Sequence, residues 1–361
     1  MNIVKATRKY EAWLGQHTRL VGRDLRRKHQ EMARKPFLFL RATFYRWLQV
    51  WPDVCPDLDR VPRVLGVGDL HVENFGTWRD TDGRLVWGVN DFDEAAQFPY
   101  TMDLVRLATS ALLAARENHL KMRPKDAVAA ILEGYQRAMQ EGGRPFVLAE
   151  DHGWLRRIAE NELRDPVEFW KKMDEFPTFR GKPPKGVREA LEHLLPQPGL
   201  KYRLVQREAG LGSLGRMRFV AIAEDRGGRI AREAKAVVPS ADYWLNPKHA
   251  PGLPQYQLIL KRAVRCPDPF VQLAGQWIVR RLSPHCSRIE LQSLGASRGE
   301  LRLLEAMGEE TANIHLGTER QRKSILQDLR RRKRNWLGQA AETMARIVEK
   351  DWRAWKEARK R

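Results

Sequence analysis

The spacing of apolar residues predicts helices near both ends of the chain and two strand-rich segments between them. Residues 5–50 alternate basic and apolar positions at helical spacing, and residues 100–120 carry apolar residues three and four apart, as an amphipathic helix does. Short apolar runs at 63–68 and on both sides of the Asp80–Gly83 turn predict strands, because Asp and Gly favour tight reversals.

The second half of the chain changes period after a mostly helical stretch at 125–195. Three strand-like runs at 202–209, 216–224 and 229–238 predict an antiparallel meander. Further elements are expected as a helix at 255–265, a strand at 276–282, a helix at 300–316 and one long helix at 325–357, whose apolar stripe most simply docks on the chain's own core.

These elements predict an α+β fold with three parts. Residues 1–200 form a helical lobe that contains a polar loop region at 63–116, and the Pro- and Gly-rich stretch at 179–186 is the best linker candidate. Residues 201–284 form a β-rich lobe. Residues 285–361 form helices that return to the first lobe and end in a basic helix.

The net charge of +20 is concentrated at the two ends of the chain. Residues 1–35 hold ten basic and three acidic side chains, and residues 319–361 hold fifteen and six. Such ends attract phosphates, nucleic acid or acidic partners, but solvated basic helices are the favoured explanation. A nucleic-acid binder is not favoured, because the basic run at 330–334 lacks interleaved aromatic residues.

Cysteine usage and hydropathy point to a cytoplasmic protein without a membrane partner. Only three cysteines occur, and none shows the C-x-x-C spacing, so a disulfide framework or a zinc site is not expected. The first residues contain no apolar signal core, and the longest apolar stretch, at 107–115, is too short to span a bilayer.

The densest chemistry lies between Gly68 and Asp103. Asp69 and Asn74 stand five residues apart in GDLHVENFG, and Asp91 follows in NDFDEA after the expected hairpin. Phosphoryl transfer needs a carboxylate for the nucleophile's proton, and oxygen ligands that hold Mg²⁺ against the phosphates. The three side chains supply these parts. The alternative is that they are ordinary turn residues, since Gly, Asp and Asn gather in turns.

These motifs resemble those of known phosphotransferases. GDLHVENFG, VNDFDEA and PYTMDLVRL resemble the HGDxHxxN, IDFxxA and DPxxDLA segments of aminoglycoside phosphotransferases and related small-molecule kinases. They resemble more closely an uncharacterised bacterial family, of unknown function and grouped with the protein-kinase-like superfamily, which shows GDxHxxNFG, NDFDE and WDLxRLxxS. The resemblance covers residues 30–116 well and 200–318 more loosely.

The resemblance implies a kinase-like fold that uses ATP and Mg²⁺, and a role for each matching residue. Asp69 corresponds to the catalytic base, Asn74 and Asp91 to metal ligands, and Asp103 to a buried Asp that steadies the catalytic loop. The scheme gives His71 no chemistry, so we expect it to bond within its loop.

The motifs contain further acidic residues, among them Asp93 and Glu73. Asp93 reaches either a second metal or its own turn, with the turn slightly favoured. Glu73 is expected to be a solvated loop residue.

A candidate phosphate loop follows the catalytic loop instead of preceding it. Gly210, Gly212 and Gly215 form GxGxxG with Ser213 between two strand-like runs, which favours a lid over nucleotide phosphates and not a Rossmann turn. Two strands later, Lys235 stands where a kinase places its third-strand lysine. This order implies a circularly permuted kinase, an arrangement that the uncharacterised family also resembles.

One departure from the kinase pattern bears on activity. A kinase pairs its strand lysine with a helix glutamate, and no Glu occurs between Ala234 and Ile289. Gln255 or Gln257 could hydrogen-bond Lys235, or Glu233 could pair with it from the same face of the strand. The main hypothesis is therefore an ATP- and Mg²⁺-dependent phosphotransferase with an unidentified small-molecule or protein acceptor. The alternative is a nucleotide-binding protein without phosphotransfer, or one that transfers AMP.

Overall fold

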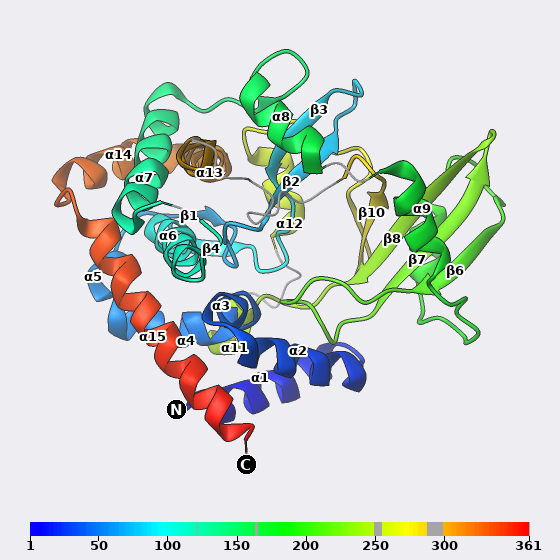
Figure 1. Ribbon diagram of the computed structural model, residues 1–361, viewed down its shortest axis with the longest axis horizontal. Coiled ribbons are helices and arrows are strands. Elements are labelled where there is room, and N and C mark those ends of the chain that lie inside the picture. Colours follow the sequence, from blue (N-terminus) through cyan, green and yellow to red (C-terminus); the bar gives the residue numbers. More distant parts are fainter. Residues whose placement is uncertain (121, 163–164, 249–254, 287–298, 361) are drawn as a thin grey trace.

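The computed structural model describes residues 1–120, 122–162, 165–248, 255–286 and 299–360. A large helical body and a smaller β-sheet lobe lie side by side, and both ends of the chain lie on the helical body (Figure 1). The expected α+β class is therefore confirmed. Among the residues described, no helix combines the length and apolarity that crossing a bilayer requires.

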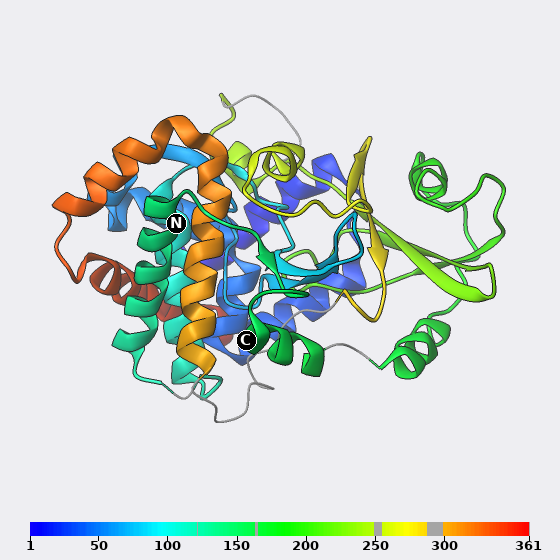
Figure 2. The ribbon, with the colours of Figure 1, turned by 90° about the horizontal axis from the view of Figure 1, so that it is seen from above.

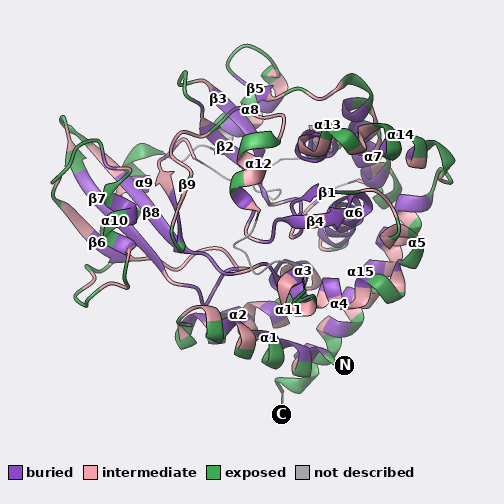
Figure 3. Ribbon diagram, turned by 180° about the vertical axis from the view of Figure 1, so that it is seen from behind, coloured by how far each residue is buried: buried purple, intermediate pink, exposed green. Residues whose placement is uncertain are grey.

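Helix α6 (Tyr100–Arg116) forms the centre of the helical body. Residues 100–114 are all buried, because α7 (Pro124–Glu141), α13 (Gly299–His315) and α15 (Trp336–Ala358) pack around them (Figure 3). The expected helices at 100–120 and 300–316 are confirmed. The other helices of this body are α1 (Ile3–His17), α2 (Gly22–Arg34), α3 (Pro36–Ala42), α4 (Phe44–Val54), α5 (Pro56–Asp59), α8 (Gly153–Glu162), α11 (Ala241–Leu245), α12 (Tyr256–Arg262), the 3₁₀ helix η2 (Leu316–Gln321) and α14 (Arg322–Arg331).

Two glycines allow α7 and α13 to cross closely. A Cβ atom on Gly134 would lie 2.0 Å from the carbonyl oxygen of Glu305, and one on Gly308 would lie 2.0 Å from that of Ile131. Any side chain at these positions would therefore push the two helices apart. The close crossing fixes α13, whose His315 contacts Asp103 of α6 and whose Glu310 accepts a hydrogen bond from Val89 N.

The prediction of a single long helix at 325–357 is wrong. The chain forms α14 and α15, separated by residues 332–335, where Arg332 adopts an extended backbone. Arg332 bonds Asp328 and stacks over Trp336, and these contacts hold the break. Several residues of the expected apolar stripe on α15 are buried against the chain's own core, as anticipated: Leu337, Ala341, Met344, Val348 and Trp355.

Two small sheets lie between α6 and the β lobe. Strand β1 (Arg63–Gly66) pairs antiparallel with β4 (Ala96–Pro99), and β2 (Phe75–Arg79) pairs with β3 (Leu85–Val89), which also pairs with β5 (Phe146–Val147). The expected reversal at 80–83 is present, because Gly83 N donates to Asp80 O at 3.1 Å. The hairpin carries the chain from residue 74 back to residue 90.

The β lobe is a five-stranded antiparallel sheet in the order β6-β7-β8-β10-β9. Its strands are β6 (Tyr202–Gln206), β7 (Arg218–Asp225), β8 (Gly228–Ala236), β9 (Gln272–Ala274) and β10 (Trp277–Leu282). The predicted meander and the predicted strand at 276–282 are thus confirmed.

Helices α9 (Pro166–Asp174) and α10 (Val187–Glu192) cover the two faces of this sheet (Figure 2). Phe169 of α9 packs with Val205 and Val220, whereas Leu191 of α10 packs with Phe219. The prediction placed both helices in the catalytic lobe by setting a boundary at residue 200. They lie on the β lobe instead, because a sheet with apolar residues on both faces needs a cover on each.

Candidate functional site

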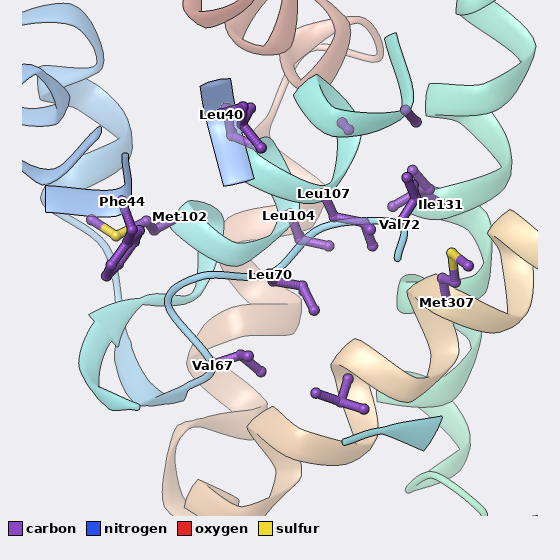
Figure 4. Close-up of a cluster of buried hydrophobic side chains, with 14 of the residues drawn as sticks. Leu40, Phe44, Val67, Leu70, Val72, Met102, Leu104, Leu107, Ile131 and Met307 are labelled. Atoms are coloured by element: carbon purple, nitrogen blue, oxygen red, sulfur yellow. The ribbon is translucent and has the colours of Figure 1, made fainter. Parts of the chain in front are cut away.

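The loop at 67–74 is held from below by apolar side chains. Val67, Leu70 and Val72 are buried among residues of α6, α7 and α13, including Leu104 and Met307 (Figure 4). Asp69 and His71 alternate with them. The sequence VGDLHV therefore buries its apolar side chains and leaves its polar ones on the opposite side.

Asp103 fixes the backbone of this loop. The Asp103 side chain is fully buried and accepts hydrogen bonds from Val67 N at 2.7 Å and Gly68 N at 2.9 Å. The ring nitrogen Nε2 of His315, on α13, lies 3.1 Å from Asp103 Oδ2. Two turns further along α6, Ser110 Oγ accepts from Val72 N at 3.0 Å. These contacts account physically for a loop-steadying role of Asp103.

A buried arginine holds the Asp69 carboxylate. Arg106 Nε donates to Asp69 Oδ1 at 3.2 Å, and Arg106 Nη2 donates to Leu40 O at 2.8 Å. The guanidinium lies over the rings of Phe44 and Trp47, 5.0 Å from each centroid. Burial raises the pKa of Asp69 although Arg106 opposes the increase. The carboxylate is thus fixed in position and has a strengthened affinity for a proton.

Asn74 joins the two acidic segments. Its Nδ2 amide donates to the backbone oxygen of Asp69 at 3.3 Å and to that of Asp91 at 3.1 Å. The amide nitrogen is therefore used within the protein, which leaves the amide oxygen as the group that could bind a cation. Asp69, Asn74 and Asp91 come together as the sequence predicted.

Lys235 reaches the same place from β8. Its Nζ lies 3.2 Å from Asp91 Oδ1 and 2.5 Å from Asp93 Oδ1, and the lysine is only 2% exposed. Burial acts to raise the pKa of Asp91, yet the Lys235 ammonium holds it well below its ordinary value. Asp91 is therefore ionised, as a metal ligand must be. Burial and the neighbouring Asp91 carboxylate raise the pKa of Asp93.

None of the three partners considered for Lys235 is bonded to it. Glu233 bonds three arginines, Gln255 accepts from Gln97 at 3.2 Å, and Gln257 is exposed on α12. The expectation that Asp93 serves mainly its own turn is also wrong, because its side chain pairs with Lys235 and with Arg216. Lys235 is therefore paired with the carboxylates of the NDFDEA segment and with none of the residues expected.

The glycine loop between β6 and β7 lies over Asp69. A Cβ on Gly212 would lie 3.0 Å from Arg41 O and 3.3 Å from Asp69 Oδ2, so a larger residue would crowd the carboxylate. Gly210 and Gly215 have φ of +74° and +98°, which favours glycine. The loop thus follows a path that its glycines permit.

Buried contacts hold the glycine loop in place. Lys28 Nζ, on α2, donates to Gly212 O at 3.1 Å, and burial lowers the pKa of Lys28 to about 8. Ser213 is buried and accepts a hydrogen bond from Arg218. Arg216, at the end of the loop, pairs with Asp93 and with Glu94, whose pKa burial raises to about 7.

Two expectations for the loop at 67–74 have opposite outcomes. His71 Nδ1 accepts from Glu73 N at 3.2 Å, as expected for a residue that bonds within its loop. Glu73 was expected to be solvated and is instead half-buried in an ion pair with Arg41. Because Arg41 comes from α3, far away in the sequence, no local pattern indicated this pair.

Two adjoining pockets share Asp91 and Gly210. The smaller, about 70 Å³, is lined by Asp69, Asn74, Gly212 and their neighbours. The larger, about 270 Å³, extends away from Asp69 between the β lobe, β2 and α12. Within the described ranges, His, Cys, Asp and Glu side chains form no cluster of three that could hold a metal. Asn74 and Asp91 could still hold Mg²⁺, because phosphate oxygens and waters complete its shell in phosphotransfer sites.

Sequence reasoning missed Arg106, Arg216 and Lys28. Arg106 could have been found, because it occupies the arginine position of the WDLxRLxxS pattern that MDLVRLATS resembles. Lys28 and Arg216 carried no such signal among 65 basic residues.

Comparison with known families covers the first half of the site. Residues 20–165 match a family described as "Uncharacterized protein conserved in bacteria (DUF2252)". No curated protein and no solved structure matches the chain. The matched segment contains Asp69, Asn74, Asp91 and Asp103, whereas the glycine loop and Lys235 lie beyond it. The chain is therefore similar to this bacterial family over the region that carries the loop at 67–74 and the NDFDEA segment.

Proposed function

We propose that the protein is a kinase-like phosphotransferase that uses Mg²⁺ and ATP and acts on an unidentified small molecule or protein. One observation carries the proposal: Lys235 lies 3.2 Å from Asp91, 144 residues away in sequence, and the glycine loop lines the same two pockets as Asp91. A strand lysine, a metal-binding Asp and a glycine loop are the parts that a kinase arranges around nucleotide phosphates.

Each residue has a role that its contacts support. Asp91 and Asn74 would hold Mg²⁺, which would neutralise charge on the transferred phosphoryl group. Asp69 accepts the proton of the acceptor, and Arg106 keeps its carboxylate in position. The glycine loop lets backbone N–H groups approach phosphates without Cβ clashes.

The order of the parts favours a circularly permuted kinase. The glycine loop connects the first two strands of the β lobe, and Lys235 lies on the third, as in kinases. These parts follow the catalytic loop in sequence instead of preceding it. Helices α1 and α15 pack together near the two chain ends (Figure 1), and permutation is physically undemanding where ends lie close.

A second candidate function rests on the partners of Lys235. In a kinase this lysine pairs with a helix glutamate, and here it contacts Asp91 and Asp93. A lysine held by the metal-binding carboxylates favours nucleotide binding without phosphotransfer, or transfer of AMP. Analysis of the products formed from ATP separates the cases, because phosphoryl transfer yields ADP and AMP transfer yields pyrophosphate.

The expected result for nucleotide binding is that ATP binds in the presence of Mg²⁺ and much more weakly without it. Calorimetric titration of the full chain with ATP, with and without Mg²⁺, measures this. In Asp91→Ala the dependence on Mg²⁺ should disappear, because the variant removes a charged metal ligand. Asp82→Ala, at an exposed carboxylate, is the matched control. No heat at millimolar Mg·ATP would refute the proposal.

A further inference from the structure

The larger of the two pockets is lined by arginines. It extends from Asp91 along the end of β10 and over the side chains of β2 and α12. Among the described lining residues, only Asp91 and Asp268 carry carboxylates. Five arginines line the pocket: Arg207, Arg218, Arg265, Arg280 and Arg281. A pocket that only enclosed the apolar faces of a nucleobase would not need this positive charge.

Three of these arginines share one carboxylate. Glu233 is fully buried beneath the pocket, and burial opposes its ionisation, but the surrounding arginines hold its pKa far below the ordinary value. Arg207 bonds Glu233 at 2.7 Å, Arg218 at 3.1 Å and Arg280 at 2.7 Å. One negative charge cannot balance three positive ones, so this wall of the pocket keeps a positive excess.

Arg265 adds an unpaired guanidinium on the opposite wall. Its carbon Cζ lies 4.7 Å from the ring centroid of Trp78 and 5.0 Å from that of Phe92. Its Nε and Nη1 atoms are buried and have no hydrogen-bond partner among the residues that the structure describes. Buried unsatisfied donors are costly, more so when they carry charge. The rings fix the plane of the guanidinium, and its donors need an acceptor.

We propose that this pocket binds a phosphate-bearing polyanion, with Arg265 and Arg280 as its principal contacts. Arginine matches phosphate oxygens with two parallel N–H groups, and an ionised acceptor strengthens each bond. The charge excess on one wall and the unpaired donors on the other both call for such a ligand. This assignment stands on the arginines, and only its link to phosphotransfer rests on the proposed function.

Two sources could supply this chemistry. The phosphates of the nucleotide itself could extend from Asp91 into the pocket, since the pocket adjoins that carboxylate. A separate phosphorylated molecule, either an acceptor or an effector, could instead bind beside the nucleotide. The two sources differ in whether the polyanion competes with Mg·ATP.

Inorganic tripolyphosphate is the probe that tests the assignment without a nucleoside. We expect calorimetry to show binding to the full chain that weakens with salt, and an affinity loss of about tenfold or more in Arg265→Gln. Among the residues that the structure describes, Arg265 forms no ion pair that this variant would remove, and a thermal melting curve checks that the variant folds. Arg302→Gln is the matched control, because Arg302 is an exposed arginine stacked over Trp154. It should bind tripolyphosphate as the unmodified protein does.

Two further binding measurements distinguish a failure of this proposal from a failure of the proposed function. Asp91→Ala should abolish the Mg²⁺-dependent binding of ATP yet keep or increase the affinity for tripolyphosphate, because it removes negative charge from the pocket wall. Displacement of tripolyphosphate by Mg·ATP assigns the pocket to the nucleotide's own phosphates, and simultaneous binding assigns it to a separate phosphorylated ligand. The assignment is overturned if tripolyphosphate does not bind at millimolar concentration, or binds equally to Arg265→Gln and the unmodified chain.

Discussion

Replacing Asp69 with asparagine is expected to reduce the turnover of Mg·ATP by about 100- to 10,000-fold, the range over which a general base contributes. The nucleotide affinity should change little, because a proton acceptor acts only in the chemical step. Asparagine keeps an oxygen toward Arg106 and nearly the same volume. Initial rates of ADP or pyrophosphate formation, with calorimetry of Mg·ATP binding on the same samples, measure the two effects separately.

The pH profile of the same reaction provides a second check. Burial raises the pKa of Asp69 above the ordinary range of an aspartate, and the base is active only when deprotonated. Turnover should therefore fall with decreasing pH at a higher pH than an ordinary aspartate would give, and this limb should vanish in Asp69→Asn. Asp82→Asn, at a largely exposed carboxylate, serves as the control. Loss of nucleotide affinity in Asp69→Asn, with turnover preserved per bound nucleotide, would reverse the assignment.

Replacing Asp103 with alanine should destabilise the whole protein by about 3–5 kcal/mol, because it leaves two buried backbone N–H groups and the His315 ring without their acceptor. The same change frees residues 67–68, which lead into Asp69. Turnover should therefore fall even at temperatures where the variant remains folded. Urea denaturation followed by far-UV circular dichroism measures the loss of stability.

The control for this effect is Asp82→Ala, which should change stability by no more than about 0.5 kcal/mol. Its side chain is 71% exposed and makes one long contact to Arg84 at 3.5 Å. Equal unfolding midpoints for the two variants would show that Asp103 does not hold the loop.

The sequence predicted those parts of the site that lie close together along the chain. Asp69, Asn74 and Asp91 could be found because a loop and one hairpin bring them together, and both have local signatures. Lys235 could be found because it lies in a strand-like run with small and apolar residues on both sides, at the place where a kinase has its strand lysine. The glycine spacing predicted the loop between β6 and β7.

Contacts made by distant side chains could not be predicted in this way. Arg106 and Arg216 are buried and paired only after the helices and the glycine loop have packed. Arg106 could be recognised only through the family pattern that it matches, and nothing local separates Arg216 from other basic residues. Helix α9 packs on the β lobe through Phe169 and Met173. In the sequence these residues indicate only one apolar side of a helix, and not the surface on which that side packs. The break before α15 likewise depends on contacts of Arg332 with Asp328 and Trp336.

The most direct test of the account is a crystal structure of the protein grown with Mn²⁺ and a non-hydrolysable ATP analogue. Mn²⁺ can replace Mg²⁺ at oxygen ligands, and its anomalous scattering locates it without ambiguity. The account predicts an anomalous peak between the Asp91 carboxylate and the Asn74 amide oxygen, with nucleotide phosphates beneath the glycine loop and next to Lys235. A nucleotide bound elsewhere, or no metal within coordination distance of Asp91, would contradict it.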